Sequence, residues 1–235
     1  MNAFKIFAEP EAVAQAAAEY LFEKINHCIE KHGICHVVLP GGSTPARCLE
    51  LLAEKPLQWQ HIHWYPGDER CYPPGHDERN DTMIMDKLFA HNDNASHEAS
   101  QTFHPVPAEQ GASNGAKIYA EFLHETLQNS NGNFDIVVLG MGEDGHTASL
   151  FPGNPALDDT HDAVAVFNAP KAPDERVSIS LQRLKNAATC MVITTGEGKY
   201  EALAKIKQGE KLPIAMVEPD IWFVDEAAVN QPFSE

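Results

Sequence analysis

Runs of apolar and β-branched residues recur along the chain and predict its strands. Most of these runs, such as ICHVVL and FDIVVLG, are dominated by apolar residues, which is typical of strands buried on both faces of a parallel sheet. The run at 221–224 is expected to close the sheet. The predicted strands are 4–7, 34–39, 61–66, 134–140, 164–167, 176–181, 189–194 and 221–224.

Helical periodicity separates the strands. Residues 10–31 carry apolar side chains on one face, with Pro10 at the start and Gly33 just past the end, as helix termini favour. The polar segments 67–77 and 91–112 are predicted as loops, and a short strand at 101–103 is allowed within the second. The predicted helices are 10–31, a helix through Leu52 with Pro45 in its first turn, 78–89, 113–128 and 196–207.

Strands that alternate with helices predict an α/β fold. We expect one Rossmann-like domain over residues 1–235, a mostly parallel sheet with helices on both faces. Ligands of such sheets bind at the carboxyl ends of the strands. Three unusual segments, 40–45, 67–72 and 140–146, follow predicted strands and should therefore converge on one crevice.

The net charge of the chain limits the kinds of molecule that it is expected to bind. The chain has 17 Lys and Arg against 34 Asp and Glu, a net charge of -17. This disfavours nucleic acid and anionic membrane surfaces, but a few local cations can still bind a small anion. No apolar run is long enough to span a membrane, and the N-terminal segment lacks the pattern of a signal peptide. We therefore expect a cytoplasmic protein.

The cysteines predict neither disulfides nor a metal ribbon. There are five, an odd number, and none forms a C-x-x-C pair, so reduced thiols are the expected state. His61 and His63 share one face of a predicted strand, but the sequence offers no evident third ligand. No metal is expected.

The segment GGSTP at 41–45 lies between a predicted strand and a helix. Gly41 and Gly42 allow close backbone approach, and Ser43 and Thr44 add hydroxyls beside the free N–H groups of a helix N-terminus. The pattern indicates a phosphate or sugar-hydroxyl site, or else a capped tight turn. It lacks the residues of a P-loop and of a nucleophile elbow.

The segment GMGEDGH at 140–146 also follows a strand. Its G-x-G-x-x-G pattern suggests a dinucleotide site, but Pro152 and Gly153 interrupt the helix that should follow, so no nicotinamide or flavin is expected. His146 is a candidate general base, with Asp144 close enough in sequence to orient it. The alternative is a histidine that only hydrogen-bonds its loop.

Two further segments carry charge. GDER at 67–70 offers Asp68 beside Glu69, an acid/base pair or simply turn residues, and Arg70, whose guanidinium can bind phosphate. PKAPDER at 170–176 places Lys171 and Arg176 in a segment stiffened by prolines. These cations would bind an anion, or form a solvated basic turn.

Taken together, these segments resemble the glucosamine-6-phosphate isomerase/6-phosphogluconolactonase family. Deaminases of the family usually continue the DGH segment with Asn-Glu-Pro and carry Asp-Glu-Tyr where this chain has Asp68-Glu69-Arg70. Here Phe151-Pro152 follows Ser149-Leu150, which resembles the lactonases. The matching residues are LPGGSTP (39–45), GDERCYPP (67–74), Asn80, 134–155, in which DGHTASLFP (144–152) is the most specific part, and 169–181.

The resemblance implies hydrolysis of 6-phospho-D-glucono-1,5-lactone in the oxidative pentose phosphate pathway, without metal or organic cofactor. It implies that His146 activates water and that Asp144 or Asp68 orients His146 or binds sugar hydroxyls. Backbone N–H groups of the glycine-rich loops are candidates for the oxyanion hole. The implied substrate-binding residues are Gly41, Gly42, Ser43, Thr44, Arg70, Asn80, Lys171 and Arg176.

Other interpretations stay open. A deaminase or isomerase of the same fold would use Asp68 to move protons on the sugar. A non-enzymatic sugar-phosphate sensor would normally carry a basic DNA-binding segment, which this acidic chain lacks. Pro40 and Arg79 depart from the Ser that many relatives have at each position. The chain is expected to be a monomer or a small homo-oligomer.

Overall fold

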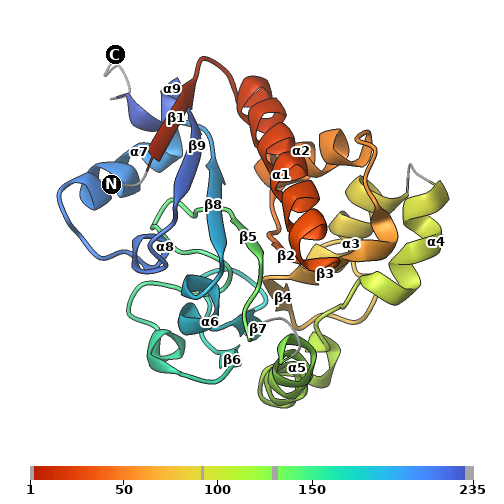
Figure 1. Ribbon diagram of the computed structural model, residues 1–235. Helices are drawn as coiled ribbons and strands as arrows, with labels where there is room; N and C mark the ends of the chain where they lie inside the picture. The colour runs from red at the N-terminus through yellow and green to blue at the C-terminus, as the bar shows by residue number, and fades with distance from the viewer. Residues whose placement is uncertain (1–2, 91–92, 129–131, 231–235) are drawn as a thin grey trace.

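A six-stranded parallel sheet forms the centre of the computed structural model, which describes residues 3–90, 93–128 and 132–230 (Figure 1). Every neighbouring pair of strands in it is parallel, which confirms the predicted α/β class. In spatial order the strands are β1 (Ala3–Phe7), β9 (Ile221–Asp225), β8 (Thr189–Thr194), β5 (Ile136–Leu139), β2 (Cys35–Leu39) and β3 (Ile62–Pro66).

The prediction that 221–224 closes the sheet was wrong. β9 lies inside the sheet and pairs with both β8 and β1, because the N-terminal strand adds outside it. The last strand in the chain is therefore covered on both edges, and β1 and β3 are the edge strands.

A second, antiparallel sheet packs beside the first. It contains β4 (Asp68–Arg70), β7 (Arg176–Ile179) and β6 (Ala163–Val166), in that order. The predicted strands 164–167 and 176–181 thus do not join the parallel sheet, and 68–70 is not loop. The link 167–175 is shorter than the roughly dozen residues that a parallel crossover needs, so β6 and β7 pair antiparallel.

Helices cover both faces of the parallel sheet, as predicted. On β2, Cys35 and Val37 pack with α1 and α2, whereas Val38 packs with α5 on the other face. The first face carries α1 (Pro10–His32), α2 (Ser43–Ala53), α3 (Asn80–Ile84) and the π-helical turn η2 (Met85–Phe89). The second carries α5 (Ala112–Leu127), α6 (Leu181–Lys185), α7 (Tyr200–Lys207), α8 (Pro213–Met216) and α9 (Glu226–Val229).

The first helix ends where the sequence predicts. Gly33 adopts φ 81°, and its N–H donates to the carbonyl of Ile29 at 2.7 Å. The predicted strand at 176–181 is shorter in the structure, because Ser180 caps α6 by accepting from the N–H of Arg183 at 3.2 Å. Short 3-10 turns are η1 (Trp59–His61), η3 (Ala108–Gln110), η4 (Pro155–Asp158) and η5 (Glu197–Lys199).

The loop predicted at 91–112 was wrong for most of its length. Residues 93–102 form α4 (Asp93–Thr102), while 91–92 lie outside the described residues. Ser96 donates to the carbonyl of Phe89 at 2.7 Å, and Thr102 donates to that of Glu98 at 3.0 Å. This polar segment has no apolar stripe to reveal a helix, which is why the periodicity missed it. No helix among the described residues is long and apolar enough to cross a membrane.

A buried ion cluster fixes the segment between β4 and α3. Arg79 is 2% exposed and donates to Asp81 at 2.6 Å and to the carbonyls of Tyr72 (2.9 Å) and Val106 (3.1 Å). These contacts give Arg79 a structural role here. Glu69 lies 3.8 Å from Arg79, and burial, reinforced by the charge of Asp81, raises the pKa of Glu69 to about 7.

We expect Arg79→Met to lower the free energy of unfolding by about 3–5 kcal/mol, because it leaves buried carboxylates and carbonyls without their donor. Arg47→Met is the matched control. Arg47 also pairs with two carboxylates, Glu11 and Glu50, but its side chain is 44% exposed, so its removal should lower the free energy of unfolding far less than the Arg79 change. Urea denaturation followed by circular dichroism measures both. Equal, small losses would contradict the structural role of Arg79.

Candidate active site

The glycine-rich loop after β2 is shaped by close contacts. A Cβ on Gly41 would lie 2.0 Å from Oδ1 of Asn80, so only glycine fits beside this side chain. Gly42 adopts φ 100° and precedes α2, which places Ser43 and Thr44 in the first turn of that helix. The hydroxyl oxygens of Thr44 and Thr195 lie 2.9 Å apart and join the loops after β2 and β8. The amides of this turn are well placed to bind an anion or a sugar hydroxyl.

Asp68 is held in place by two side chains. The amide of Asn80 donates to Oδ1 of Asp68 at 3.1 Å and to its carbonyl at 2.8 Å, and Ser149 donates to Oδ2 at 2.5 Å. Asp68 is 5% exposed. It therefore ties together β4, the start of α3 and the segment after His146. Its hydrogen bonds do not include His146.

Asp144 is the carboxylate that orients His146. Nδ1 of His146 lies 2.5 Å from Oδ1 of Asp144, which also accepts the backbone N–H of His146 at 3.1 Å. Partial burial opposes ionisation of Asp144, but the hydrogen bonds and the charge of His146 outweigh it and lower the pKa of Asp144. A carboxylate on Nδ1 retains the proton there and leaves Nε2 as the basic nitrogen. The imidazole is partly accessible, with 29% of the side chain exposed.

Two glycines of GMGEDG allow the turn that carries Asp144 and His146 to form. A Cβ on Gly142 would lie 2.1 Å from Nδ1 of His146 and 2.7 Å from Oδ1 of Asp144. Gly145 adopts φ 80°, and a Cβ there would lie 2.5 Å from Leu212. Both glycines are thus explained by the His146–Asp144 pair and its support, without a dinucleotide.

The ring of Phe151 lies against both His146 and Arg176. Its ring centroid lies 4.6 Å from that of His146, and Cζ of Arg176 lies 5.8 Å from the same ring. The sequence analysis did not assign Phe151 to the site. The only signal for it was its place in DGHTASLFP, seven residues after Asp144.

Arg70 and Arg176 face each other across β4 and β7 as Cα partners. Arg176 is 5% exposed and donates to the carbonyls of Pro173 (3.2 Å) and Lys171 (2.9 Å), so it braces the loop that carries Lys171. Burial lowers the pKa of Arg176, and the charge of Asp68 opposes this. Arg70 donates to the carbonyl of Glu78, and its Nε is buried without a hydrogen-bond partner in the described part of the chain.

Lys199 is a site residue that the sequence analysis missed. It is half-buried in η5, after β8. Burial lowers the pKa of Lys199, and the charge of Lys171 adds to this, while the charges of Glu143 and Asp144 oppose it. Lys199 and the exposed Lys171 thus influence each other electrostatically, and we treat both as candidates for binding one anion. The position of Lys199 after a strand, in the segment GEGK, was the available signal.

A separate pocket of about 270 Å³ lies beside the glycine-rich loop. It contains Arg47, whose charge is already neutralised by Glu11 and Glu50, so Arg47 is not counted among the candidate anion-binding cations. Its lining residues are Pro10, Glu11, Ser43, Thr44, Arg47 and Thr195. Among the described residues, the three-residue group with metal-ligand spacing lies elsewhere, at Cys28, Cys35 and Asp135.

Known proteins match almost the whole chain. A 6-phosphogluconolactonase of Haemophilus influenzae is 31% identical over 243 residues, which covers 98% of this chain and 99% of the relative. One of Rattus norvegicus is 31% identical over 239 residues, with 96% and 91% covered. The solved 6-phosphogluconolactonase of Shewanella baltica has TM-score 0.80 at 28% identity, covering 96% of this chain and 97% of that one.

The fold is shared more widely. The solved 6-phosphogluconolactonase of Thermotoga maritima has TM-score 0.85 at 24% identity, covering 96% of this chain and all of that one, and this likeness concerns the fold alone. The family model of glucosamine-6-phosphate isomerases/6-phosphogluconolactonase matches residues 8–228. This range includes every residue of the site described above. The chain belongs to the glucosamine-6-phosphate isomerase/6-phosphogluconolactonase family.

Proposed function

We propose that this chain hydrolyses 6-phospho-D-glucono-1,5-lactone to 6-phospho-D-gluconate, a step of the oxidative pentose phosphate pathway. The observation that carries the proposal is the His146–Asp144 pair, with 2.5 Å between Nδ1 and Oδ1, in a family whose similar members are named 6-phosphogluconolactonases. An oriented imidazole with a free Nε2 is what activation of water requires.

The chemistry needs one general base that then acts as an acid. Nε2 of His146 takes a proton from water as the oxygen attacks the lactone carbonyl carbon. The tetrahedral intermediate then collapses, the bond from that carbon to the ring oxygen breaks, and His146 returns the proton to the departing oxygen. Backbone N–H groups of the loop at Gly41 and Gly42 are our candidates for the oxyanion donors, since the N–H of Gly142 already donates to the carbonyl of His146 at 2.9 Å. Asp144 holds the imidazole throughout and stabilises its charged form.

The phosphate would be bound by cations from three loops. The charges of Lys171 and Asp144 both influence the pKa of Lys199, and Arg176 supports the loop of Lys171. Arg70 lies beside Arg176 and adds to the local positive charge. Ser43 and Thr44 would bind substrate oxygens at the N-terminus of α2. Asp68 and Asn80 would act by positioning Gly41 against the substrate, since both are buried and bonded to each other.

The deaminase alternative is less well supported by the geometry. Both carboxylate oxygens of Asp68 accept hydrogen bonds, from Asn80 and Ser149, so this residue is poorly placed to move protons on a sugar. Release of ammonia from glucosamine 6-phosphate would nevertheless identify that activity. We also propose a cytoplasmic monomer or small homo-oligomer that acts without an organic cofactor and binds no nucleic acid, in keeping with its net charge of -17.

We expect His146→Asn to lower kcat about 100- to 10,000-fold, because it removes the general base. The chain offers a matched control in His161, whose Nδ1 lies 2.6 Å from Asp159 in the same i, i+2 arrangement but whose side chain is 79% exposed. His161→Asn should leave kcat unchanged. The assay uses freshly made lactone, with the spontaneous hydrolysis rate subtracted. Near-normal turnover in a folded His146→Asn enzyme would exclude the proposed base.

Gly142→Ala should lower kcat about 100-fold, since its Cβ displaces the imidazole by a distance that catalysis tolerates poorly. Gly140→Ala, two residues earlier, is the control because its Cβ would have its nearest contact at 3.8 Å, with Pro45. Neither glycine has a positive φ, so backbone strain does not confuse the comparison. Melting temperatures of both variants establish folding. Equal activities would mean that the position of His146 is not critical.

Lys171→Met and Lys199→Met should each lower kcat/KM for the phosphorylated lactone about 10- to 100-fold, the equivalent of one charge-assisted hydrogen bond. The unphosphorylated glucono-1,5-lactone should react equally well with both variants and with the unmodified protein. Lys205→Met changes the net charge identically on the exposed side of α7 and should affect neither substrate. A uniform loss for both lactones would contradict a phosphate clamp.

A further inference from the structure

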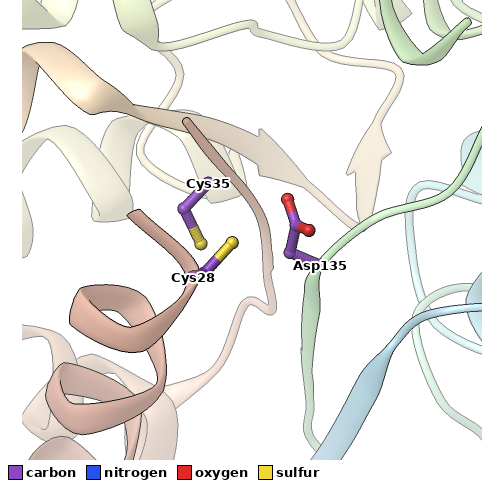
Figure 2. Close-up of side chains that lie close together, drawn as sticks. All are labelled: Cys28, Cys35 and Asp135. Atoms are coloured by element: carbon purple, nitrogen blue, oxygen red, sulfur yellow. The ribbon is translucent and has the colours of Figure 1, made fainter. Parts of the chain in front are cut away.

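Two thiols and a carboxylate meet at the amino ends of β2 and β5, away from the proposed catalytic site (Figure 2). Cys28 lies near the end of α1, Cys35 begins β2, and Asp135 directly precedes β5. The two sulfur atoms and a carboxylate oxygen all lie within 4.8 Å of one another. Cys35 is fully buried and Cys28 is 8% exposed, whereas Asp135 is partly exposed and gives the cluster a side open to solvent.

The position of the cluster separates it from the lactonase chemistry. Cys35 and Asp135 are at the amino ends of β2 and β5, whereas Gly41 and His146 follow the carboxyl ends of the same two strands. The mechanism proposed above uses none of the three residues. Another reason for their juxtaposition must therefore be sought in the residues themselves.

The backbone holds the carboxylate toward the thiols. The N–H of His36 donates to Oδ2 of Asp135 at 2.8 Å, and the N–H of Asp135 donates to the carbonyl of His36 at 3.1 Å. Figure 2 shows the sulfur atoms of Cys28 and Cys35 next to each other, with the Asp135 carboxylate across from them. In metal sites, hydrogen bonds from neighbouring groups that do not bind the ion orient a ligating carboxylate in this way.

The cluster gathers ligands without a cationic side chain to balance them. In the described part of the chain, no Lys or Arg nitrogen lies within 4.0 Å of the Asp135 carboxylate. Cys28 donates to the carbonyl of Ile34 at 3.5 Å. Two sulfurs and one oxygen form the ligand set of a thiophilic ion, because Mg²⁺ and Ca²⁺ require oxygen ligands instead.

We propose that Cys28, Cys35 and Asp135 form a binding site for a divalent cation of the zinc class. Zinc accepts both cysteine sulfur and aspartate oxygen, and four ligands complete its usual coordination, so three protein ligands leave one position for water. Binding exchanges the two thiol protons, which pass to solvent, for the ion. The bound ion joins the end of α1 to β2 and β5, and its role is structural.

The test uses the full-length, reduced protein, freed of metal with a chelator that is then removed. Cobalt(II) serves as the spectroscopic probe, because thiolate ligation gives a charge-transfer band in the near ultraviolet. Isothermal titration with zinc gives the stoichiometry and affinity. We expect one ion per chain, the thiolate band, and a higher melting temperature with zinc.

The variants assign the ligands. Cys28→Ser and Cys35→Ser should abolish the thiolate band or halve it, and should weaken zinc binding at least 100-fold, while Asp135→Asn should weaken it at least tenfold. Cys48→Ser is the matched control, because Cys48 is equally buried in the same core cluster but is outside the ligand group. It should bind cobalt and zinc like the unmodified protein. Lactonase kcat should not change in any of them.

Three results would overturn the proposal. The first is the absence of a thiolate band in the unmodified protein, a result that depends on no variant. The second is zinc binding retained by folded Cys28→Ser and Cys35→Ser, which would locate the ion on surface histidines. The third is a protein that binds no cobalt but forms a Cys28–Cys35 disulfide when hydrogen peroxide is added. In that reaction the two thiols lose their hydrogen atoms and the peroxide is reduced to water, so the pair would be a redox dithiol.

Discussion

The buried ion cluster at the start of α3 is the constraint on which the active-site geometry depends. Glu69 has no exposed surface and accepts the N–H groups of Arg70, Asn80 and Asp81 at 2.8 Å each. Arg79 supplies the nearby positive charge. Polar groups that are buried away from water must form hydrogen bonds or ion pairs with one another. This requirement restricts the segment between β4 and α3 to one conformation. Asn80 is thereby fixed between Asp68 and Gly41, and the loop that carries Gly41 takes its shape from that contact.

The parallel sheet divides the molecule into two ends with different chemistry. Its carboxyl end carries the oriented histidine and the cations. Its other end carries side chains that pack with each other, including three stacked histidines, His36, His63 and His104. Burial, with the charge of His63, lowers the pKa of His36 and His104 to about 4, so these two are neutral near pH 7. The prediction that His61 and His63 share a strand was wrong, because His61 ends the turn η1 and only His63 lies in β3. His63 bonds His104 at 2.8 Å and is explained by this stack.

Under the proposed function, the local charges account for how an acidic protein accepts an anionic substrate. The net charge of -17 acts at long range, where salt screens it within about 10 Å. Lys171, Lys199 and Arg176 would act at short range, and burial of Arg176 and Lys199 keeps part of the water away from their charges. Arg176 has the additional task of bracing the loop of Lys171 through carbonyl contacts. Recognition and loop structure are therefore coupled at this residue.

The sequence by itself determined the parallel sheet and the segment of the proposed general base. Runs dominated by apolar residues, such as 134–140, are typical of strands covered on both faces, and His146 stands out because glycines surround it. The choice between Asp68 and Asp144 could not be made there. It depends on a turn around Gly142 and on the contacts of Asn80, which are tertiary facts.

The pairing of strands and the packing of the whole chain decided the remaining contacts. Residues 163–166 and 176–179 have the composition of buried strands, and only the short link between them forces an antiparallel sheet. Lys199 joins Lys171, and Cys28 and Cys35 join Asp135, across long stretches of chain. Spacing along a sequence shows which side chains share one helix or strand, but the register between β2 and β5 brings Asp135 to the cysteines. Strand order and register arise from packing the whole chain, so the tertiary structure alone could decide these contacts.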